Sequence, residues 1–176
     1  MANRELTVEV EVFGEAIAQT AEIAPPVTWQ AWLQAWLHQL APTLSPINAY
    51  ELSLQFTTDT AIAALNRDYR QQDQPTDVLS FAGIDGPPLP PELLAMIPFH
   101  LGDLIISVET AQRQCDAHSH SLKEELAWLA AHGLLHLLGW DHPDEAQLQA
   151  MWAMQRSLLA SIGLSLPESA YVAETR

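Results

Sequence analysis

Positively charged side chains are scarce in this chain of 176 residues. It has 7 Lys and Arg against 22 Asp and Glu, which gives a formal net charge of −15 at pH 7. This balance excludes broad, unspecific attraction to nucleic acids or to anionic membranes. It still permits a polyanionic substrate that binds where positive charge is concentrated locally, and a bound metal ion is one means of concentrating it.

Cysteine and long apolar runs are scarce as well. The one cysteine, Cys115, excludes an internal disulfide and cannot supply the several thiolates of a typical structural zinc site. We expect it to be a small core residue. A transmembrane helix is not expected, because no run of about 18 apolar residues occurs. Residues 1–12 lack the basic start and apolar block of a signal peptide, so we expect a cytoplasmic protein.

The chain has the length and apolar content of one domain, residues 1–176, and 48% of its residues are hydrophobic. Alternating or continuous apolar segments predict four strands, at residues 6–12, 50–56, 77–82 and 101–107. Apolar stripes of helical period predict five helices, which begin near Thr28, Asp59, Ser107, Ser121 and Pro143. This order predicts an α+β domain in which about five helices cover a mixed sheet of about four strands.

Local signals indicate where three of the helices begin. Thr28 is the expected cap of the first helix, and Thr58 or Asp59 that of the second. Ser121, with Glu124 three residues later, has the pattern of a capping box. This pair is the clearest start signal in the sequence.

Further features concern the second half of the chain. Residues 83–98 are rich in proline and are expected to form a loop without regular structure. Glu125 lies in the first turn of its helix, where the helix dipole favours negative charge. Asp141 or His142 is expected to cap the last helix, with Pro143 in the first turn.

Three of the seven histidines fall within one short segment, HGLLHLLGWDH. His132 and His136 are four residues apart, so on a helix they share one face. Gly139 suits the left-handed residue that ends a helix, and the chain can then return His142 toward the other two. Three neutral nitrogen ligands without a fourth protein ligand leave an open coordination position, which is typical of a catalytic metal site.

The spacing of these histidines is also that of the metzincin proteases, which carry a glutamate after the first histidine. Gly133 occupies that position here, so the general base of a peptide hydrolase is missing. The other four histidines are expected to be ordinary surface or hydrogen-bonded residues: His38, His100, His118 and His120. Of these, His118 and His120 closely precede the metal-binding helix.

Three segments together resemble the bacterial YbeY family of metal-dependent endoribonucleases. HGLLHLLGWDH (132–142) is similar to the family signature, LNRDYRQQDQPTDVLSF (65–81) to its second motif, and LGDLIIS (101–107) to its third. Trp140 stands where an aromatic residue such as tyrosine is usual, and the loop 83–98 is richer in proline than is typical. Three motifs in the right order make the resemblance far more specific than the histidines alone.

The resemblance implies a zincin-like fold and cleavage of single-stranded RNA. It also implies a role in ribosome quality control and in maturation of ribosomal RNA, especially at the 3′ end of the small-subunit RNA. The implied metal ligands are His132, His136 and His142, and the implied conserved arginine is Arg70. The implied metal is zinc, one ion per chain, with nickel as a substitute because histidine-rich sites accept both.

The chemistry of such a site involves two candidate catalytic residues. Arg70 is suited to hold a phosphate bidentately and to stabilise charge in the transition state. Arg67, one turn earlier, is expected to be a solvated helix residue. Asp141 is the one carboxylate inside the signature and is either a general base or a residue that positions its neighbours. The attacking group is either a water activated by the metal or the RNA 2′-hydroxyl.

Two other classes of function remain open from the sequence. One is a metalloprotease or other zinc hydrolase, against which Gly133 argues. The other is a ribosome-assembly factor whose metal is structural, and an acidic chain would suit docking on basic ribosomal proteins. The expected partners are therefore single-stranded or ribosomal RNA and the small ribosomal subunit with its proteins, and neither DNA nor a membrane.

Overall fold

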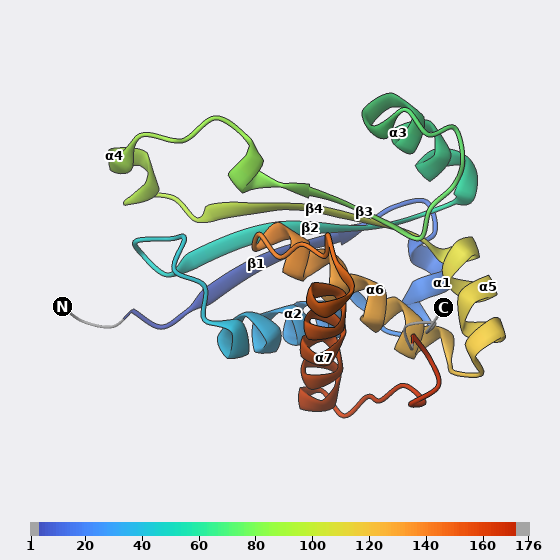
Figure 1. Ribbon diagram of the computed structural model, residues 1–176. Helices are drawn as coiled ribbons and strands as arrows, with labels where there is room; N and C mark the ends of the chain where they lie inside the picture. Colours follow the sequence, from blue (N-terminus) through green and yellow to red (C-terminus); the bar gives the residue numbers. More distant parts are fainter. Residues whose placement is uncertain (1–3, 172–176) are drawn as a thin grey trace.

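A mixed sheet of four strands forms the centre of the computed structural model, which describes residues 4–171 (Figure 1). The outermost residues of the predicted domain, 1–3 and 172–176, lie outside the described part. The strands are β1 (Thr7–Phe13), β2 (Ala49–Thr57), β3 (Val78–Ala82) and β4 (Phe99–Ser107), in the order β1-β2-β4-β3. β1, β2 and β4 are parallel, whereas β3 pairs antiparallel with β4 and forms one edge of the sheet.

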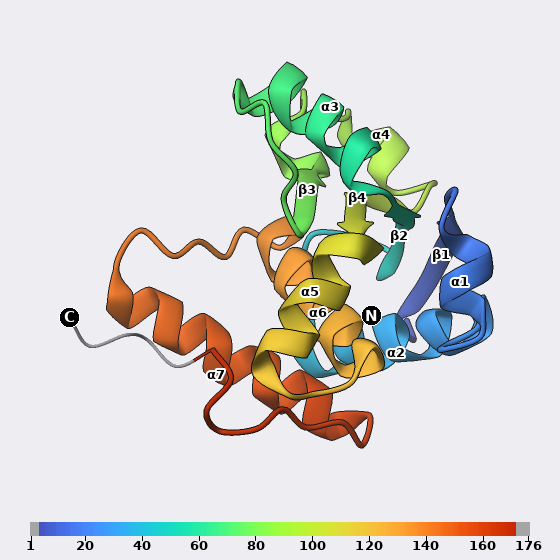
Figure 2. The same ribbon diagram turned by 90° about the vertical axis from the view of Figure 1, so that its right-hand side faces the viewer.

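Helices cover the two faces of the sheet unequally. One face carries α1 (Ile17–Ala21), α2 (Pro26–Leu40), α5 (Val108–His118), α6 (Leu122–Leu137) and α7 (Glu145–Ser161), and the opposite face carries α3 (Asp59–Arg70) (Figures 1 and 2). The short α4 (Pro91–Leu94) lies in the connection between β3 and β4. The predicted α+β fold is confirmed, with its mixed four-stranded sheet and five longer helices. Among the described residues, none of the helices has both the length and the apolar character needed to cross a membrane.

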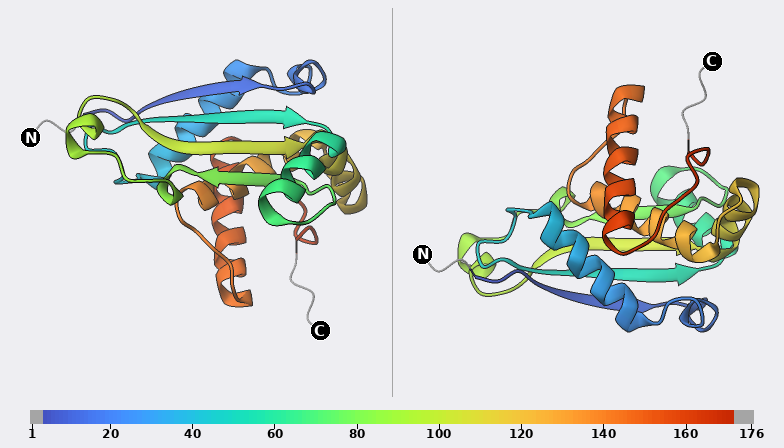
Figure 3. Two further views of the ribbon diagram at one scale, coloured as in Figure 1. Left: turned by 90° about the horizontal axis from the view of Figure 1, so that it is seen from above. Right: turned by 90° about the horizontal axis from the view of Figure 1, so that it is seen from below.

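The main core lies between the sheet and helices α2 and α6, which cover the same face of it (Figure 3). On β2, alternate residues from Tyr50 to Phe56 are buried, as the alternation predicts. The expected tryptophan stripe of α2 packs against them, with Trp29 and Trp36 fully buried. A small second cluster of Ile62, Leu79 and Ile105 lies between α3 and the other face. The sheet is therefore deeply covered on the α6 side only.

Two helix starts differ from the prediction. α2 begins at Pro26 rather than at Thr28, because proline lacks an N–H and its fixed φ suits the first helical position. α7 begins at Glu145, and its cap is Asp144, whose side chain accepts a hydrogen bond from the backbone N–H of Gln147 at 2.8 Å. Pro143 thus precedes the helix. The predicted caps at Thr58 and Ser121 are confirmed, the latter as a complete capping box.

Two short helices were not predicted. α1 has only five residues. The proline-rich segment 83–98 is not wholly irregular, since it contains a 3₁₀ turn at Gly83–Asp85 as well as α4. Pro91 is the first residue of α4, where proline is tolerated, so the prolines delimit this helix rather than exclude it.

Glu125 departs furthest from its expected role. Its carboxylate is fully buried and forms hydrogen bonds with the His120 ring and the Tyr171 hydroxyl. Burial raises the pKa of Glu125 and also that of Tyr171. The Tyr171 ring stacks on Trp128 of α6, with the ring centroids 4.9 Å apart. This polar cluster fastens the C-terminal segment to α6.

Replacing Tyr171 by Phe tests this attachment. The variant keeps the ring on Trp128 but leaves the buried Glu125 carboxylate without one donor, so we expect the free energy of unfolding to fall by about 1–3 kcal/mol. Urea denaturation measures the change. Tyr69→Phe is the matched control, because Tyr69 is 68% exposed and its variant should unfold like the wild type. Equal stability of Tyr171→Phe and the wild type would contradict the assigned bond.

Candidate metal centre

Helix α6 packs very closely against β3 and β4 at Gly133. A Cβ atom on Gly133 would stand 2.7 Å from Leu104 Cδ2 and 3.1 Å from Ser80 Oγ. Glycine suits this approach of helix to sheet, because a larger residue would force Leu104 or Ser80 to shift. Gly133 and the apolar residues that follow it face the core. His132 and His136 lie on another side of the same helix, and both are only partly buried.

The predicted histidines come together as the spacing requires. His132 Nε2 and His136 Nε2 lie 3.1 Å apart, and one nitrogen from each of His132, His136 and His142 lies within 4.8 Å of the other two. The turn that returns His142 follows α6 directly. Gly139 has φ +93°, and the backbone N–H of Trp140 donates to the Leu135 carbonyl at 2.9 Å. All three rings are partly buried.

Hydrogen bonds hold two of the rings in one tautomer. His136 Nδ1 lies 2.9 Å from the Trp140 carbonyl oxygen, which accepts only. His132 Nδ1 lies 3.1 Å from Gln155 Oε1, and Gln155 Nε2 donates to the Trp128 carbonyl at 3.2 Å, which fixes the amide orientation. Both rings therefore carry the proton on Nδ1 and present the Nε2 lone pair to the centre of the cluster.

Burial also keeps these rings uncharged. It lowers the pKa of His132 to about 4 and lowers the pKa of His136 as well. At neutral pH both imidazoles are neutral, which is the form that binds a metal ion. Zinc–nitrogen bonds of about 2.0–2.1 Å in tetrahedral geometry separate two nitrogens by about 3.3 Å. The 3.1 Å between His132 Nε2 and His136 Nε2 fits this separation, and a His142 nitrogen lies within 4.8 Å of both.

A hollow of about 290 Å³ borders the cluster and contains both predicted catalytic residues. Arg70, from the end of α3, and Asp141, from the turn after α6, line it together with His136. Among residues 4–171, no carboxylate lies within ion-pair distance of Arg70, whereas Arg67 pairs with Asp68 at 3.1 Å. Asp141 Oδ1 accepts a hydrogen bond from the backbone N–H of His142 at 2.8 Å. Arg67 is 55% exposed, as expected of a solvated helix residue.

Sequence reasoning missed several residues around the cluster. Gln155 is fully buried and orients His132, and Ser80 and Ile84 line the hollow. The signal for Gln155 was a polar residue four positions after Met151, on the buried stripe of α7. Ser80 and Ile84 gave no comparable signal, because their place depends on how β3 lies against α6.

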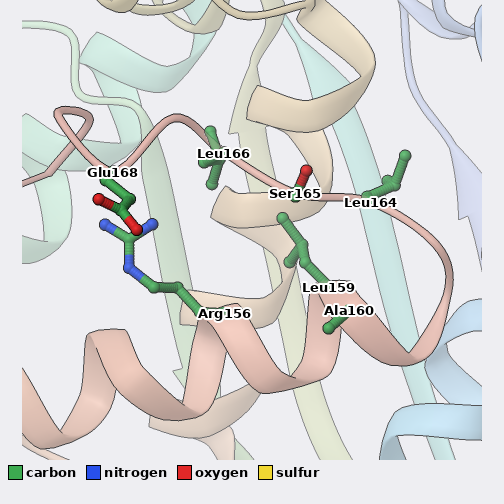
Figure 4. Close-up of a pocket in the computed structure, with 7 residues that line it drawn as sticks. All are labelled: Arg156, Leu159, Ala160, Leu164, Ser165, Leu166 and Glu168. Atoms are coloured by element: carbon green, nitrogen blue, oxygen red, sulfur yellow. The ribbon is translucent and has the colours of Figure 1, made fainter.

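Two further histidines and a second hollow lie away from the metal cluster. In the described part of the chain, His118 and His120 do not join the metal cluster, since His118 packs on Tyr171 and His120 binds Glu125. A second hollow of about 420 Å³ lies between α7 and the segment that follows it (Figure 4). Arg156 there donates to the Ala170 carbonyl at 2.7 Å and points toward Glu168. This arginine therefore interacts with the C-terminal segment of its own chain.

Fold and site together define an α+β protein with a three-histidine cluster suited to one metal ion. The family model described as "Endoribonuclease YbeY" matches residues 16–163. The chain is 50% identical over 165 residues to "Endoribonuclease YbeY" of Cyanothece sp. (strain PCC 7425), with 92% of this chain and 96% of the relative covered. It is 48% identical to the protein of that name from Synechocystis sp. (strain PCC 6803), with 93% and 92% covered. The chain therefore belongs to the YbeY family.

A solved structure supports the fold independently. The solution structure of TM1509 from Thermotoga maritima matches 88% of this chain and 89% of its own, with a TM-score of 0.56 and 21% sequence identity. At this identity the likeness concerns the arrangement of helices and strands alone.

Gln155→Leu tests whether Gln155 orients His132. Without the amide oxygen the ring can rotate or change tautomer, so we expect about 10- to 100-fold weaker binding of Zn²⁺. Competition with a chromophoric chelator measures the affinity, and ¹⁵N NMR of the metal-free protein reports the His132 tautomer. Gln155→Glu keeps an acceptor and should retain binding. Gln147→Leu, an exposed position on the same helix, is the matched control. Unchanged affinity and tautomer in Gln155→Leu would refute this role.

Proposed function

We propose that this chain is a metal-dependent endoribonuclease that cleaves single-stranded RNA. Its metal ion, zinc or nickel as a substitute, is held by His132, His136 and His142. A divalent ion held by these histidines would supply Lewis-acid chemistry toward a phosphoryl oxygen or a water. Family membership supports the reaction class, and the cluster of three histidine nitrogens supports the metal.

One observation carries the proposal beyond the family name. Arg70 and His136 line the same hollow although they come from helices on opposite faces of the sheet. In a chain with a net charge of −15, an arginine without a carboxylate partner among the described residues beside a metal-binding cluster is suited to a phosphate group. The guanidinium binds a phosphate through two parallel hydrogen bonds and stabilises charge that develops in the transition state.

Asp141 has a positioning role in this proposal. Its Oδ1 accepts a hydrogen bond from the backbone N–H of His142 and so helps to hold the turn that carries the third imidazole. Its exposure at the hollow leaves Oδ2 as the candidate proton acceptor for the attacking group. With RNA, that group is the 2′-hydroxyl or a water, and both need a proton removed.

Gly133 argues against a protease. It stands where metzincins carry the glutamate that serves as general base, and it has no carboxylate. It packs instead against Leu104 and Ser80, where a Cβ atom would be crowded. The general base of a metzincin is therefore missing from this position, and peptide hydrolysis is not favoured.

The strong negative charge bears on how substrate reaches the site. Few basic residues are available to release counterions, so affinity for free RNA is expected to be weak. We propose that basic proteins of the small ribosomal subunit bind this acidic chain and present the RNA, and that its substrate is ribosomal RNA near the small-subunit 3′ end. We accordingly propose that the protein acts in the cytoplasm, in maturation of that end and in ribosome quality control.

A side-by-side assay tests the reaction class. Purified wild type and His136→Ala are given one RNA oligomer, its DNA equivalent and an unfolded protein, each with and without chelator. We expect one divalent ion per chain by elemental analysis, cleavage of RNA alone, and loss of both metal and activity in His136→Ala, because two ligands rarely hold zinc. His38→Ala, an exposed histidine on α2, is the control and should match the wild type.

Two outcomes of that assay would contradict the proposal. Chelator-sensitive proteolysis without RNA cleavage would identify a protease. Inactivity on all three substrates and on ribosomal particles, with normal metal content, would identify an assembly factor with a structural ion.

Arg70→Ala separates phosphate binding from the fold. Arg70 is exposed at the end of α3, so we expect unchanged thermal stability and metal content, with RNA cleavage about 10²- to 10³-fold slower. Arg67→Ala removes the same charge one turn earlier and should have little effect, since Arg67 already pairs with Asp68. Wild-type cleavage rates in Arg70→Ala, or equal losses in both variants, would refute a specific role for Arg70.

A further inference from the structure

Tyr69 is an exposed aromatic residue beside the candidate phosphate-binding arginine. Its side chain is 68% exposed, the most of any aromatic residue in the described part of the chain. It immediately precedes Arg70 at the end of α3. Exposure of a single apolar residue is ordinary on a protein surface, so the place of Tyr69 beside Arg70 and the contacts of its ring carry the argument.

The Tyr69 ring is held in place rather than free. It meets Phe81 of β3 in an edge-to-face contact, with centroids 5.0 Å apart and ring planes at 66°. The helix end that carries it is anchored as well, because buried Asn66 donates from Nδ2 to the Gln74 carbonyl at 2.9 Å. We call Tyr69 and Phe81 the aromatic platform. Since most of Tyr69 is exposed, at least one face of its ring is open.

The platform and the metal cluster lie on the two sides of one edge strand. Ser80 of β3 faces α6 and lines the hollow with His136, while the next residue, Phe81, points to the α3 side. β3 pairs only with β4, so within residues 4–171 no strand covers its outer edge. Arg70 spans this edge, because it lies at the end of α3 and lines the hollow on the other side. Figure 2 shows α3 and α6 on opposite sides of β3.

We infer that the aromatic platform stacks an unpaired nucleobase of the RNA strand whose phosphate is bound at Arg70. This inference rests on the proposed function and assigns part of its substrate specificity. A strand that crosses the edge of β3 places a phosphate in the hollow and a neighbouring base against Tyr69. Bases in a duplex are already stacked on one another, so the platform selects single strands. Stacking also supplies affinity that a chain with few basic residues cannot obtain from charge.

Binding without cleavage tests the inference. The probe is a short oligouridylate RNA with one central 2-aminopurine, whose fluorescence is quenched when the base stacks, titrated at low salt into metal-free protein. We expect quenching by the wild type and about 5- to 100-fold weaker binding by Tyr69→Ala. Tyr69→Phe and Tyr69→Trp, which keep a ring, should bind within about twofold of the wild type. Phe13→Ala is the matched control, an exposed aromatic residue on the opposite edge strand β1, and should bind like the wild type.

A second readout separates stacking from a general loss of function. In the metal-loaded enzyme, Tyr69→Ala should raise KM for the same RNA by a similar factor and leave kcat nearly unchanged, because stacking holds substrate and transition state alike. Thermal denaturation checks that the variant is folded, as expected for so exposed a side chain. A duplex of the same length should bind wild type and Tyr69→Ala equally weakly.

The possible results distinguish this inference from the proposed function. Quenching that depends on Tyr69 supports the platform even if no RNA is cleaved, and in that case only the proposed reaction fails. Cleavage by the wild type with unchanged binding by Tyr69→Ala overturns the platform and leaves the reaction intact. Absence of quenching by the wild type, or equal losses on single strands and duplex, also overturns it.

Discussion

The close contact of α6 with β3 and β4 at Gly133 is the constraint on which the rest of the site depends. It fixes the distance between the helix and the sheet, and thereby the position of the imidazoles of His132 and His136 relative to β3 and β4. The same contact brings Ser80 beside the cluster and sets the wall of the hollow. A bulkier residue at this position would crowd Leu104 and Ser80, so that these side chains or the helix would have to shift.

Hydrogen bonds from outside the cluster then fix the orientation of two of its histidine rings. Gln155 reaches the site from α7, and the Trp140 carbonyl reaches it from the turn after α6, so that each ring has one acceptor for its Nδ1 proton. Gln155 is in turn fixed by Trp128, on which Tyr171 stacks. The C-terminal segment thus contributes to the rigidity of the histidine cluster although it contains none of the histidines. Rigid support of this kind is what keeps ligands in a productive geometry.

Most of the fold and the three histidines of the cluster could be predicted from the sequence. The residues that could not be predicted depend on contacts between elements that are distant in sequence. The spacing of His132, His136 and His142 is a local pattern on one helix and one turn, and the structure brings the three together. The strands and five longer helices followed from periodicity. Glu125 could not be understood locally, since its burial depends on Tyr171, 46 residues later. Gln155 and Ser80 likewise acquire their roles through contacts between elements that are distant in sequence.

The lone cysteine has a consequence for the conditions under which such a site survives. Cys115 is 2% exposed, and burial raises the pKa of its thiol, so it is neither accessible nor present as the reactive thiolate. The histidine cluster contains no sulfur. Oxidants that convert thiolates to sulfenic acids or disulfides therefore find no ligand to attack. A centre built from imidazoles alone would keep its donor atoms during oxidative stress, when zinc sites built from cysteine release their ion.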